Sequence, residues 1–296
     1  MTIDLVLPKD IELTHLLDEI RKLSWAAADV LMAYARGQKP PYGFEKSLSV
    51  VEGGDGPVSA ADIAINELLI SGLKNNFSYQ EWDILSEENC KERKIRGAEN
   101  EKDWCWIIDP LDGTKDFLQG SENYAVHIAL VFKQKPKIGI VLIPERNELW
   151  FGIIGGGAWY ENRDGHKNNI SFSDRIDISE MVLVSSKNHQ QSKLLDLISS
   201  LCFAETKQIG SVGCKVASIL RGESDVYISL SGKTSPKDWD MAAPHALIEA
   251  AGGVFSHADG TALTYYKPTY SQSGCLIASH GKSHKKVCEK TMEFFS

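Results

Sequence analysis

The spacing of apolar residues predicts two helices near the start of the chain. From Ile11 to Ala35, apolar side chains recur every three or four positions, so one broad helical face is hydrophobic. A second helix is expected from Ser59 to about Leu73, where Ser59 and Asp62 have the Ser-x-x-Asp spacing of a capping box. Between these helices, residues 42–57 are rich in glycine and predict a loop.

Shorter apolar runs predict strands in the middle of the chain and alternating strands and helices after it. The expected strands are residues 104–108, 124–132, 138–143, 149–154, 158–160, 181–185, 225–230 and a last one from Val254, and the expected later helices are residues 191–201, 212–220 and 240–251. The first block has the pattern of an antiparallel sheet. We therefore expect a mixed α and β protein, one compact unit of two closely packed sub-domains, residues 1–170 and 171–296.

Composition and charge restrict the class of protein and of partner. With 296 residues, of which 43% are hydrophobic and 24% charged, the chain can bury a sizeable core. A formal net charge of −8 argues against nucleic acid as the main partner, but a small phosphorylated molecule is compatible because a metal can supply local positive charge. No apolar run has membrane-spanning length, and the first residues lack a secretory signal. Six scattered cysteines without a C-x-x-C pair indicate neither zinc nor disulfides, and a cytoplasmic location is expected.

The most informative segment is residues 109–117, Asp-Pro-Leu-Asp-Gly-Thr-Lys-Asp-Phe, which follows an expected buried strand. A tight loop at the strand end can aim Asp109, Asp112 and the carbonyl of Leu111 at one point. Oxygen ligands of this kind suit a hard divalent cation such as magnesium. The segment therefore predicts a metal site.

The two residues after these carboxylates could add an anion site. Gly113 and Thr114 can begin a helix whose unpaired backbone N–H groups face a phosphate. Metal plus phosphate is one interpretation of the segment. An ordinary strand-to-helix turn, in which Asp, Gly and Thr are common for local reasons, is the other.

A site for two metal ions needs further carboxylates from distant segments, and two segments offer them. Glu87 and Glu88 follow the apolar run at residues 82–85, where a solvated loop is the simpler interpretation. Asp240 precedes small residues at an expected helix start, and an N-cap aspartate would explain it equally well.

Taken together and in this order, the segments Ser-Glu-Glu, Asp-Pro-Leu-Asp-Gly-Thr-Lys-Asp-Phe and Trp-Asp-x-Ala-Ala-Pro before a helix ending in Gly-Gly resemble the inositol monophosphatase family. This family contains lithium-sensitive, magnesium-dependent phosphatases. The resemblance extends from about Ser24 to Ala278 and implies a layered αβαβα sandwich.

The resemblance also implies a set of metal ligands. Glu87, Asp109 and the Leu111 carbonyl would hold a first magnesium ion, and Asp109, Asp112 and Asp240 a second. A third, weaker ion would use Glu87 and water.

In the same comparison, Thr114 would bond the attacking water, and Asp62 would orient or deprotonate Thr114, which alone is a poor base. The phosphate would lie across the metals and the backbone N–H groups of Gly113 and Thr114, with Asp240 also near the substrate. Lys115 and Asp116 would orient the loop, or simply form a surface ion pair.

Within the family, the Lys-Asp-Phe after Asp-Gly-Thr is similar to the 3′(2′),5′-bisphosphate nucleotidase branch. The segments around His189 and around Ser211 and Lys215 are similar to those that hold the nucleotide, although a surface histidine and a helix cap would explain the first two residues. The implied activity is removal of the 3′-phosphate from adenosine 3′,5′-bisphosphate, and from its sulfated precursor. Inositol 1-phosphate hydrolysis and a catalytically silent phosphate-ligand sensor are the alternatives. The stretch 42–57 is longer than the tight connection typical of the family.

Overall fold

A computed structural model describes residues 5, 7–8, 11–52, 57–77, 82–90, 102–188, 191–232 and 234–296. The elements of its first half are α1 (Leu13–Ala35), β1 (Val50–Glu52), β2 (Pro57–Ser59), α2 (Ala60–Asn76), β3 (Trp82–Ser86), β4 (Trp104–Asp112), α4 (Thr114–Leu118), β5 (Ala125–Phe132), β6 (Lys135–Ile143), η1 (Pro144–Arg146), β7 (Glu148–Ile153), β8 (Gly157–Glu161) and β9 (Lys167–Asn169). Those of its second half are η2 (Ile178–Glu180), β10 (Val182–Ser186), α5 (Ser192–Leu201), β11 (Glu205–Ile209), α6 (Val212–Leu220), β12 (Val226–Leu230), α7 (Asp238–Ala250), β13 (Val254–His257), β14 (Cys275–Ser279) and α8 (His284–Phe295).

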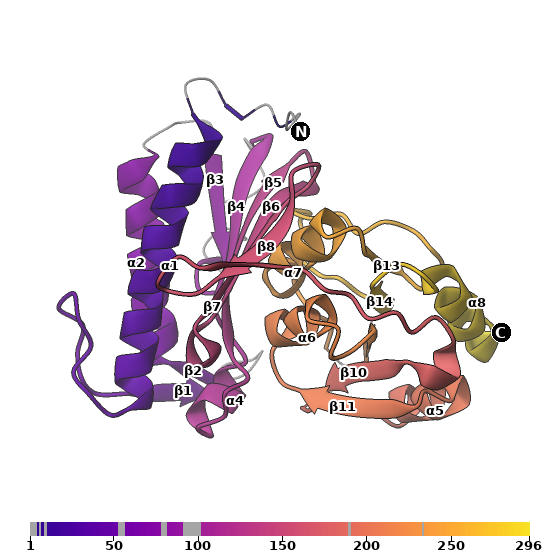
Figure 1. The fold of residues 1–296 in the computed structure, drawn as a ribbon. Helices are drawn as coiled ribbons and strands as arrows, with labels where there is room; N and C mark the ends of the chain where they lie inside the picture. The colour runs from indigo at the N-terminus through magenta and orange to yellow at the C-terminus, as the bar shows by residue number, and fades with distance from the viewer. Residues whose placement is uncertain are drawn as a thin grey trace.

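These elements form five layers, which Figure 1 shows from left to right. Helices α1 and α2 cover one face of a seven-stranded sheet, α6 and α7 lie between this sheet and a five-stranded sheet, and α5 and α8 cover the far face of the second sheet. The predicted αβαβα sandwich is confirmed. None of the helices among the described residues is both long enough and apolar enough to cross a membrane.

The first sheet has the order β3-β4-β5-β6-β7-β8-β9, with β3 parallel to β4 and every other neighbour antiparallel. Its central strands are buried on both faces, so their sequences are almost continuously apolar. In β4, Trp106 and Ile108 pack toward α1 and α2, whereas Cys105 and Ile107 pack toward the middle layer. This alternation decides which β4 side chains can reach the second half of the chain.

The second sheet has the order β11-β10-β12-β14-β13. Strands β11, β10 and β12 are parallel, so their carboxyl ends meet at one edge of the sheet, and β14 runs antiparallel between β12 and β13. Open sheets with parallel strands bind ligands at such an edge.

Helix α7 lies directly on the first sheet because both surfaces lack large side chains. A Cβ atom on Gly139 in β6 would lie 2.4 Å from the Ala243 carbonyl oxygen, and one on Gly152 in β7 would lie 2.7 Å from the Cα of Leu247. The small residues after Asp240 thus bring the start of α7 to the end of β4.

Most predicted elements of the chain are present within one or two residues of their expected bounds. The differences concern strands β1, β2, β9, β11 and β14, helix α8 and the short helices η1 and η2, which the apolar pattern did not predict. Strand β11 lies at the edge of its sheet and is mainly polar and exposed. Its sequence therefore lacks the alternation of apolar and polar residues that predicts a strand. The predicted loop at 42–57 is wrong for residues 50–52 and 57, which belong to the β1–β2 hairpin, and residues 53–56 lie outside the described part. The division into sub-domains at residue 170 stays a prediction.

Candidate active site

The two carboxylates of the Asp-Pro-Leu-Asp segment lie within strand β4 rather than in a loop after it. Asp109 pairs with His127 and Asp112 with Ala125, so three steps along β4 oppose two steps along β5. In a regular strand, residues three apart point to opposite faces; the extra residue of this β-bulge puts both carboxylates on the same face. Leu111 lies in the bulge and packs on the opposite face, toward α1 and α2.

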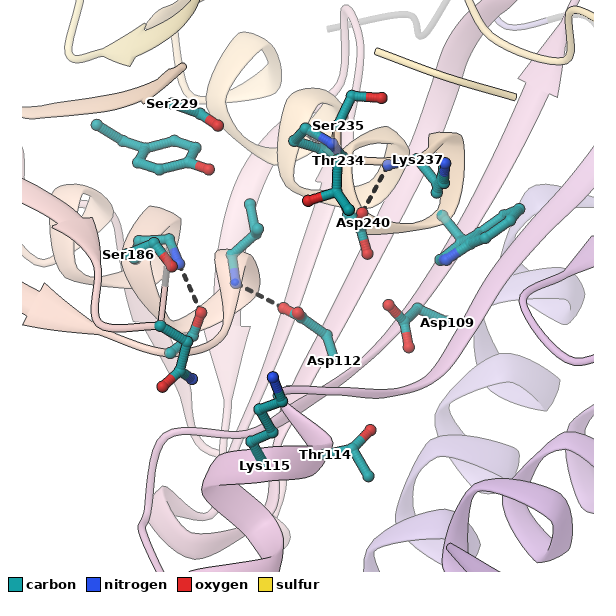
Figure 2. Close-up of a pocket in the computed structure, with 18 of the residues that line it drawn as sticks. Asp109, Asp112, Thr114, Lys115, Ser186, Ser229, Thr234, Ser235, Lys237 and Asp240 are labelled. Atoms are coloured by element: carbon teal, nitrogen blue, oxygen red, sulfur yellow. Dashed lines mark hydrogen bonds between the residues drawn. The ribbon is translucent and has the colours of Figure 1, made fainter. Parts of the chain in front are cut away.

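A third carboxylate comes from the start of α7. Oxygen atoms of Asp109, Asp112 and Asp240 lie within 4.8 Å of one another, and Figure 2 shows the three side chains pointing toward a common space. Asp240 is the third residue of α7 and accepts a hydrogen bond from the Lys237 backbone N–H at 2.6 Å. The predicted helix start is confirmed, but the N-cap residue is Lys237 and not Asp240.

Glu87 lies beside this cluster, in the turn after β3. Its backbone N–H donates to the Ile108 carbonyl at 3.2 Å, which fixes the turn against β4. Its side chain lines the same cleft as the three aspartates and as Leu111. The Leu111 carbonyl oxygen lies 3.1 Å from the Thr114 hydroxyl oxygen.

Crowding of negative charge shifts the pKa values of this cluster. Burial, followed by the charges of neighbouring carboxylates, raises the pKa of Glu87 and of Asp109 well above their ordinary values. Burial and the Asp112 charge raise the pKa of Asp240 to about 6. Because all the potential ligand atoms are oxygens and no positive charge within the cluster balances the carboxylates, the residues fit a hard divalent cation.

Asp112 differs from its neighbours because groups from the start of α6 and from β5 surround one of its oxygens. Oδ2 accepts hydrogen bonds from the Ser211 hydroxyl at 2.6 Å, the Val212 N–H at 2.6 Å and the Gly213 N–H at 3.1 Å, and His127 Nε2 lies 3.1 Å away. Burial alone would raise the pKa of Asp112, but the His127 ring and these donors outweigh it and hold the pKa below its ordinary value. Asp112 therefore binds the start of α6 to the end of β4.

The Thr114 hydroxyl is placed by a second buried carboxylate. It donates to Asp62 Oδ1 at 3.0 Å, and the other oxygen of Asp62 accepts from the Ser59 N–H at 2.8 Å and the Ser59 hydroxyl at 2.5 Å. The predicted capping box at the start of α2 is confirmed. Burial raises the pKa of Asp62, which makes its carboxylate a better proton acceptor.

The carboxylates lie at one end of a cleft between the two halves of the chain. Its volume, including the open mouth, is about 1280 Å³. Beyond the carboxylates the cleft continues along the carboxyl ends of β10 and β12, where Ser186, Asn188 and Ser229 line it (Figure 2 labels the two serines). The space is thus larger than one phosphate group needs, and its far part is lined by polar and apolar residues of the second half.

The residues expected to hold a nucleotide are only partly brought to this cleft. Lys215 and Gly113 line it. The Lys215 ammonium is buried and donates to the Ile209 and Gly210 carbonyls at 3.1 and 2.6 Å, and burial lowers its pKa to about 8. Ser211 is the N-cap of α6, and its hydroxyl also donates to Asp112. His189 lies outside the described residues.

Two features of the site differ from the sequence interpretation. Lys115 and Asp116 do not form a surface ion pair, because Lys115 is exposed at the cleft whereas Asp116 is fully buried against Asn188. His127, which the sequence analysis missed, is buried between Asp112 and the Trp239 carbonyl. A histidine within the otherwise apolar run of residues 124–132, shortly after the Asp109 segment, was the signal in the sequence that could have identified it.

Comparisons with known proteins agree on one family. The model of the inositol monophosphatase family matches residues 12–294. The chain is 32% identical over 253 residues to the 3′(2′),5′-bisphosphate nucleotidase CysQ of Escherichia coli (strain K12), covering 84% of this chain and 94% of that one. It is 29% identical over 252 residues to the Nus factor SuhB of Vibrio cholerae, covering 84% and 87%.

Among solved structures, a staphylococcal inositol monophosphatase-1 soaked in lithium chloride superimposes with a TM-score of 0.75. It is 20% identical, covers 95% of this chain and 96% of its own, and so shows the fold. With the family match over nearly the whole length and the acidic cluster in place, this chain belongs to the inositol monophosphatase family of phosphatases.

Proposed function

We propose that this protein is a magnesium-dependent phosphatase that removes the 3′-phosphate from adenosine 3′,5′-bisphosphate and from its sulfated precursor. The observation that carries the proposal is that one cleft is lined by the acidic cluster, by Thr114 with its hydrogen bond to Asp62, and by residues of the second half of the chain. The similarity to bisphosphate nucleotidases favours this substrate among the phosphate esters that the family accepts.

In this proposal, Asp109, Asp112 and Asp240 with Glu87 and the Leu111 carbonyl hold two or three magnesium ions. Bound magnesium supplies positive charge beside the phosphate and acidifies water. Oδ2 of Asp112 already accepts hydrogen bonds from the start of α6, so its other oxygen would be the one available to a metal ion.

Thr114 and Asp62 would handle the proton of the attacking water. The threonine O–H donates to Asp62, which leaves the lone pairs of its oxygen to accept a hydrogen bond from water. Asp62 is held in place by Ser59 and accepts the proton through Thr114. The Gly113 and Thr114 backbone N–H groups at the start of α4 would contact the phosphate oxygens. The backbone at residue 113 has a φ of 94°, which glycine adopts without strain.

The remote part of the cleft would hold the rest of the nucleotide. Lys215, buried near Asp112 and Asp240, places positive charge between the cluster and the second half, which suits a substrate with two phosphates. Roles for Ser211 and His189 in nucleotide binding stay predictions.

Inositol 1-phosphate is the second candidate substrate, favoured by the inositol monophosphatases among the similar structures. The test is phosphate release with magnesium from adenosine 3′,5′-bisphosphate and from inositol 1-phosphate, each with and without lithium. We expect a higher kcat/KM for the nucleotide. A preference for inositol phosphate would replace the proposed substrate and keep the metal centre, and turnover of neither ester would favour a phosphate-ligand sensor.

A further inference from the structure

Asp116 is a fully buried carboxylate of α4 that contacts the second half of the chain beside the cleft. Its Oδ2 accepts a hydrogen bond from the Asn188 side-chain amide at 3.0 Å. The Lys187 ammonium lies 3.7 Å from Oδ1 and also 3.5 Å from the Gln119 amide oxygen. Both partners of Asp116 directly follow β10, so this carboxylate connects α4 to the residues at the end of β10.

The same carboxylate contacts the connection between β11 and α6. Gly210 approaches it so closely that a Cβ atom there would lie 2.0 Å from Asp116 Oδ2. Gly210 directly precedes the N-cap of α6, and its carbonyl accepts a hydrogen bond from Lys215 at 2.6 Å. Two connections of the second half thus meet at one side chain of the first half.

Both connections contribute to the cleft wall. Asn188 and Gln191 line the cleft after β10, and Gly210 and Lys215 line it after β11. A carboxylate can only accept hydrogen bonds, so Asp116 binds the NH2 group of the Asn188 amide, and the amide oxygen of Asn188 faces away from it. Without Asp116, the Asn188 amide would lose this orientation.

We propose that Asp116 is a positioning residue for substrate specificity: it holds Lys187 and Asn188, which follow β10, and the β11–α6 connection against α4, so that the cleft wall remote from the reacting phosphate keeps its place relative to the metal centre. The choice of substrate rests on the proposed function. Asp116 bonds to neither the acidic cluster nor Thr114 among the described contacts. Its loss should therefore weaken binding of the remote part of the substrate and leave the chemical step nearly unchanged.

The kinetic test compares Asp116→Asn, Asn188→Ala and their combination in the magnesium-loaded protein. Asp116→Asn keeps an oxygen that can accept from Asn188 but removes the charge, so we expect the KM of adenosine 3′,5′-bisphosphate to rise about fivefold, the difference between a charged and a neutral hydrogen bond. The kcat should change by less than about threefold, and the inhibition constant of inorganic phosphate, which needs only the metal centre, should not change. The KM of the double variant should not exceed the higher KM of the two single variants, because both substitutions remove the same interaction.

Two further variants separate positioning from general destabilisation. Gly210→Ala keeps Asp116 but displaces its carboxylate, and it should raise the same KM. Asp225→Asn removes another fully buried carboxylate, bonded to Arg175 far from the cleft, and should lower thermal stability without changing KM. A fall in kcat at constant KM, equal weakening of phosphate and nucleotide, or additive single effects would overturn the proposal.

Hydrogen exchange gives a readout that does not depend on turnover. The Lys187 N–H donates to the Ile209 carbonyl at 3.3 Å and so links the residue after β10 to the last residue of β11. Asp116→Asn should accelerate exchange of this amide with magnesium present, and unchanged exchange would contradict the proposal. If no ester were hydrolysed, the proposed function would fail while this measurement still tested the role of Asp116.

Discussion

Thr114 is the residue at which the proposed chemistry depends on a single hydroxyl. Thr114→Val removes the donor to Asp62 while keeping the shape of the side chain, so kcat should fall by about 10²- to 10⁴-fold. Thr114→Ser should keep most of the activity because it retains the hydroxyl. Phosphate release at saturating magnesium measures both, with the melting temperature and magnesium affinity as controls. A valine variant of nearly full activity would show that Thr114 takes no part in the reaction.

Asp109 has opposite effects on stability and on function. Burial, followed by the charges of neighbouring acids, raises the pKa of its carboxylate, so Asp109→Asn should raise the melting temperature of the metal-free protein near neutral pH. The same change should abolish stabilisation by magnesium and turnover. Thermal unfolding with a chelator and then with magnesium measures both effects.

Asp225→Asn is the matched control for this prediction. Asp225 is equally buried, but it pairs with Arg175 and accepts the Val182 N–H at 2.6 Å. Removing its charge should destabilise the protein by about 3–5 kcal/mol, because Arg175 loses its charged partner and asparagine offers one acceptor oxygen where aspartate offers two. Destabilisation of the same size by Asp109→Asn would contradict the proposal that Asp109 is a buried charge that only a bound cation compensates.

Helix α7 shows how an element, rather than a residue, sets the site. Gly139→Ala should push α7 away from β6 at Ala243, three residues after Asp240, and cost about 1–3 kcal/mol of stability. Gly152→Ala meets Leu247, farther along the helix, and should cost a similar amount. Magnesium affinity, measured by calorimetry, should fall more for Gly139→Ala. Equal affinities in the two variants would mean that Asp240 does not depend on the packing of its helix.

Strand β4 shows why the sequence located the site but not its geometry. The residue types of the Asp109 segment indicated oxygen ligands, and Ser59 and Asp62 indicated a helix start correctly. A spacing of three residues does not state to which face each carboxylate points. The bulge that aligns Asp109 with Asp112 depends on pairing with β5 and therefore could not be inferred from the segment alone.

For the molecule as a whole, the acidic cluster predicts a stability that responds to pH and magnesium together. Glu87, Asp109 and Asp240 have raised pKa values, so the folded state binds their protons more tightly than the unfolded state. Without metal, their contribution to stability therefore falls as pH rises through the ordinary carboxyl range toward the raised values. Asp112, with its lowered pKa, acts in the opposite direction and loses its contribution as pH falls.

Because magnesium binds the ionised carboxylates, the rise in melting temperature on adding magnesium should be larger at about pH 8 than at about pH 5. Thermal unfolding with chelator or magnesium at both pH values measures the difference. The Asp109→Asn variant serves as the control and should show little response at either pH. An equal response of the unchanged protein at both pH values would contradict a binding site made of these carboxylates.

The sequence by itself determined the layered mixture of helices and strands, the family, and the residue types of the acidic cluster, because apolar periodicity and a short motif are local properties. Only the tertiary structure decided how these parts meet: the bulge in β4, the donors from α6 around Asp112, and the burial of His127 and Asp116. Each depends on contacts between residues far apart in the chain. Hydrogen bonds and burial at such contacts are set by packing, which local sequence does not encode.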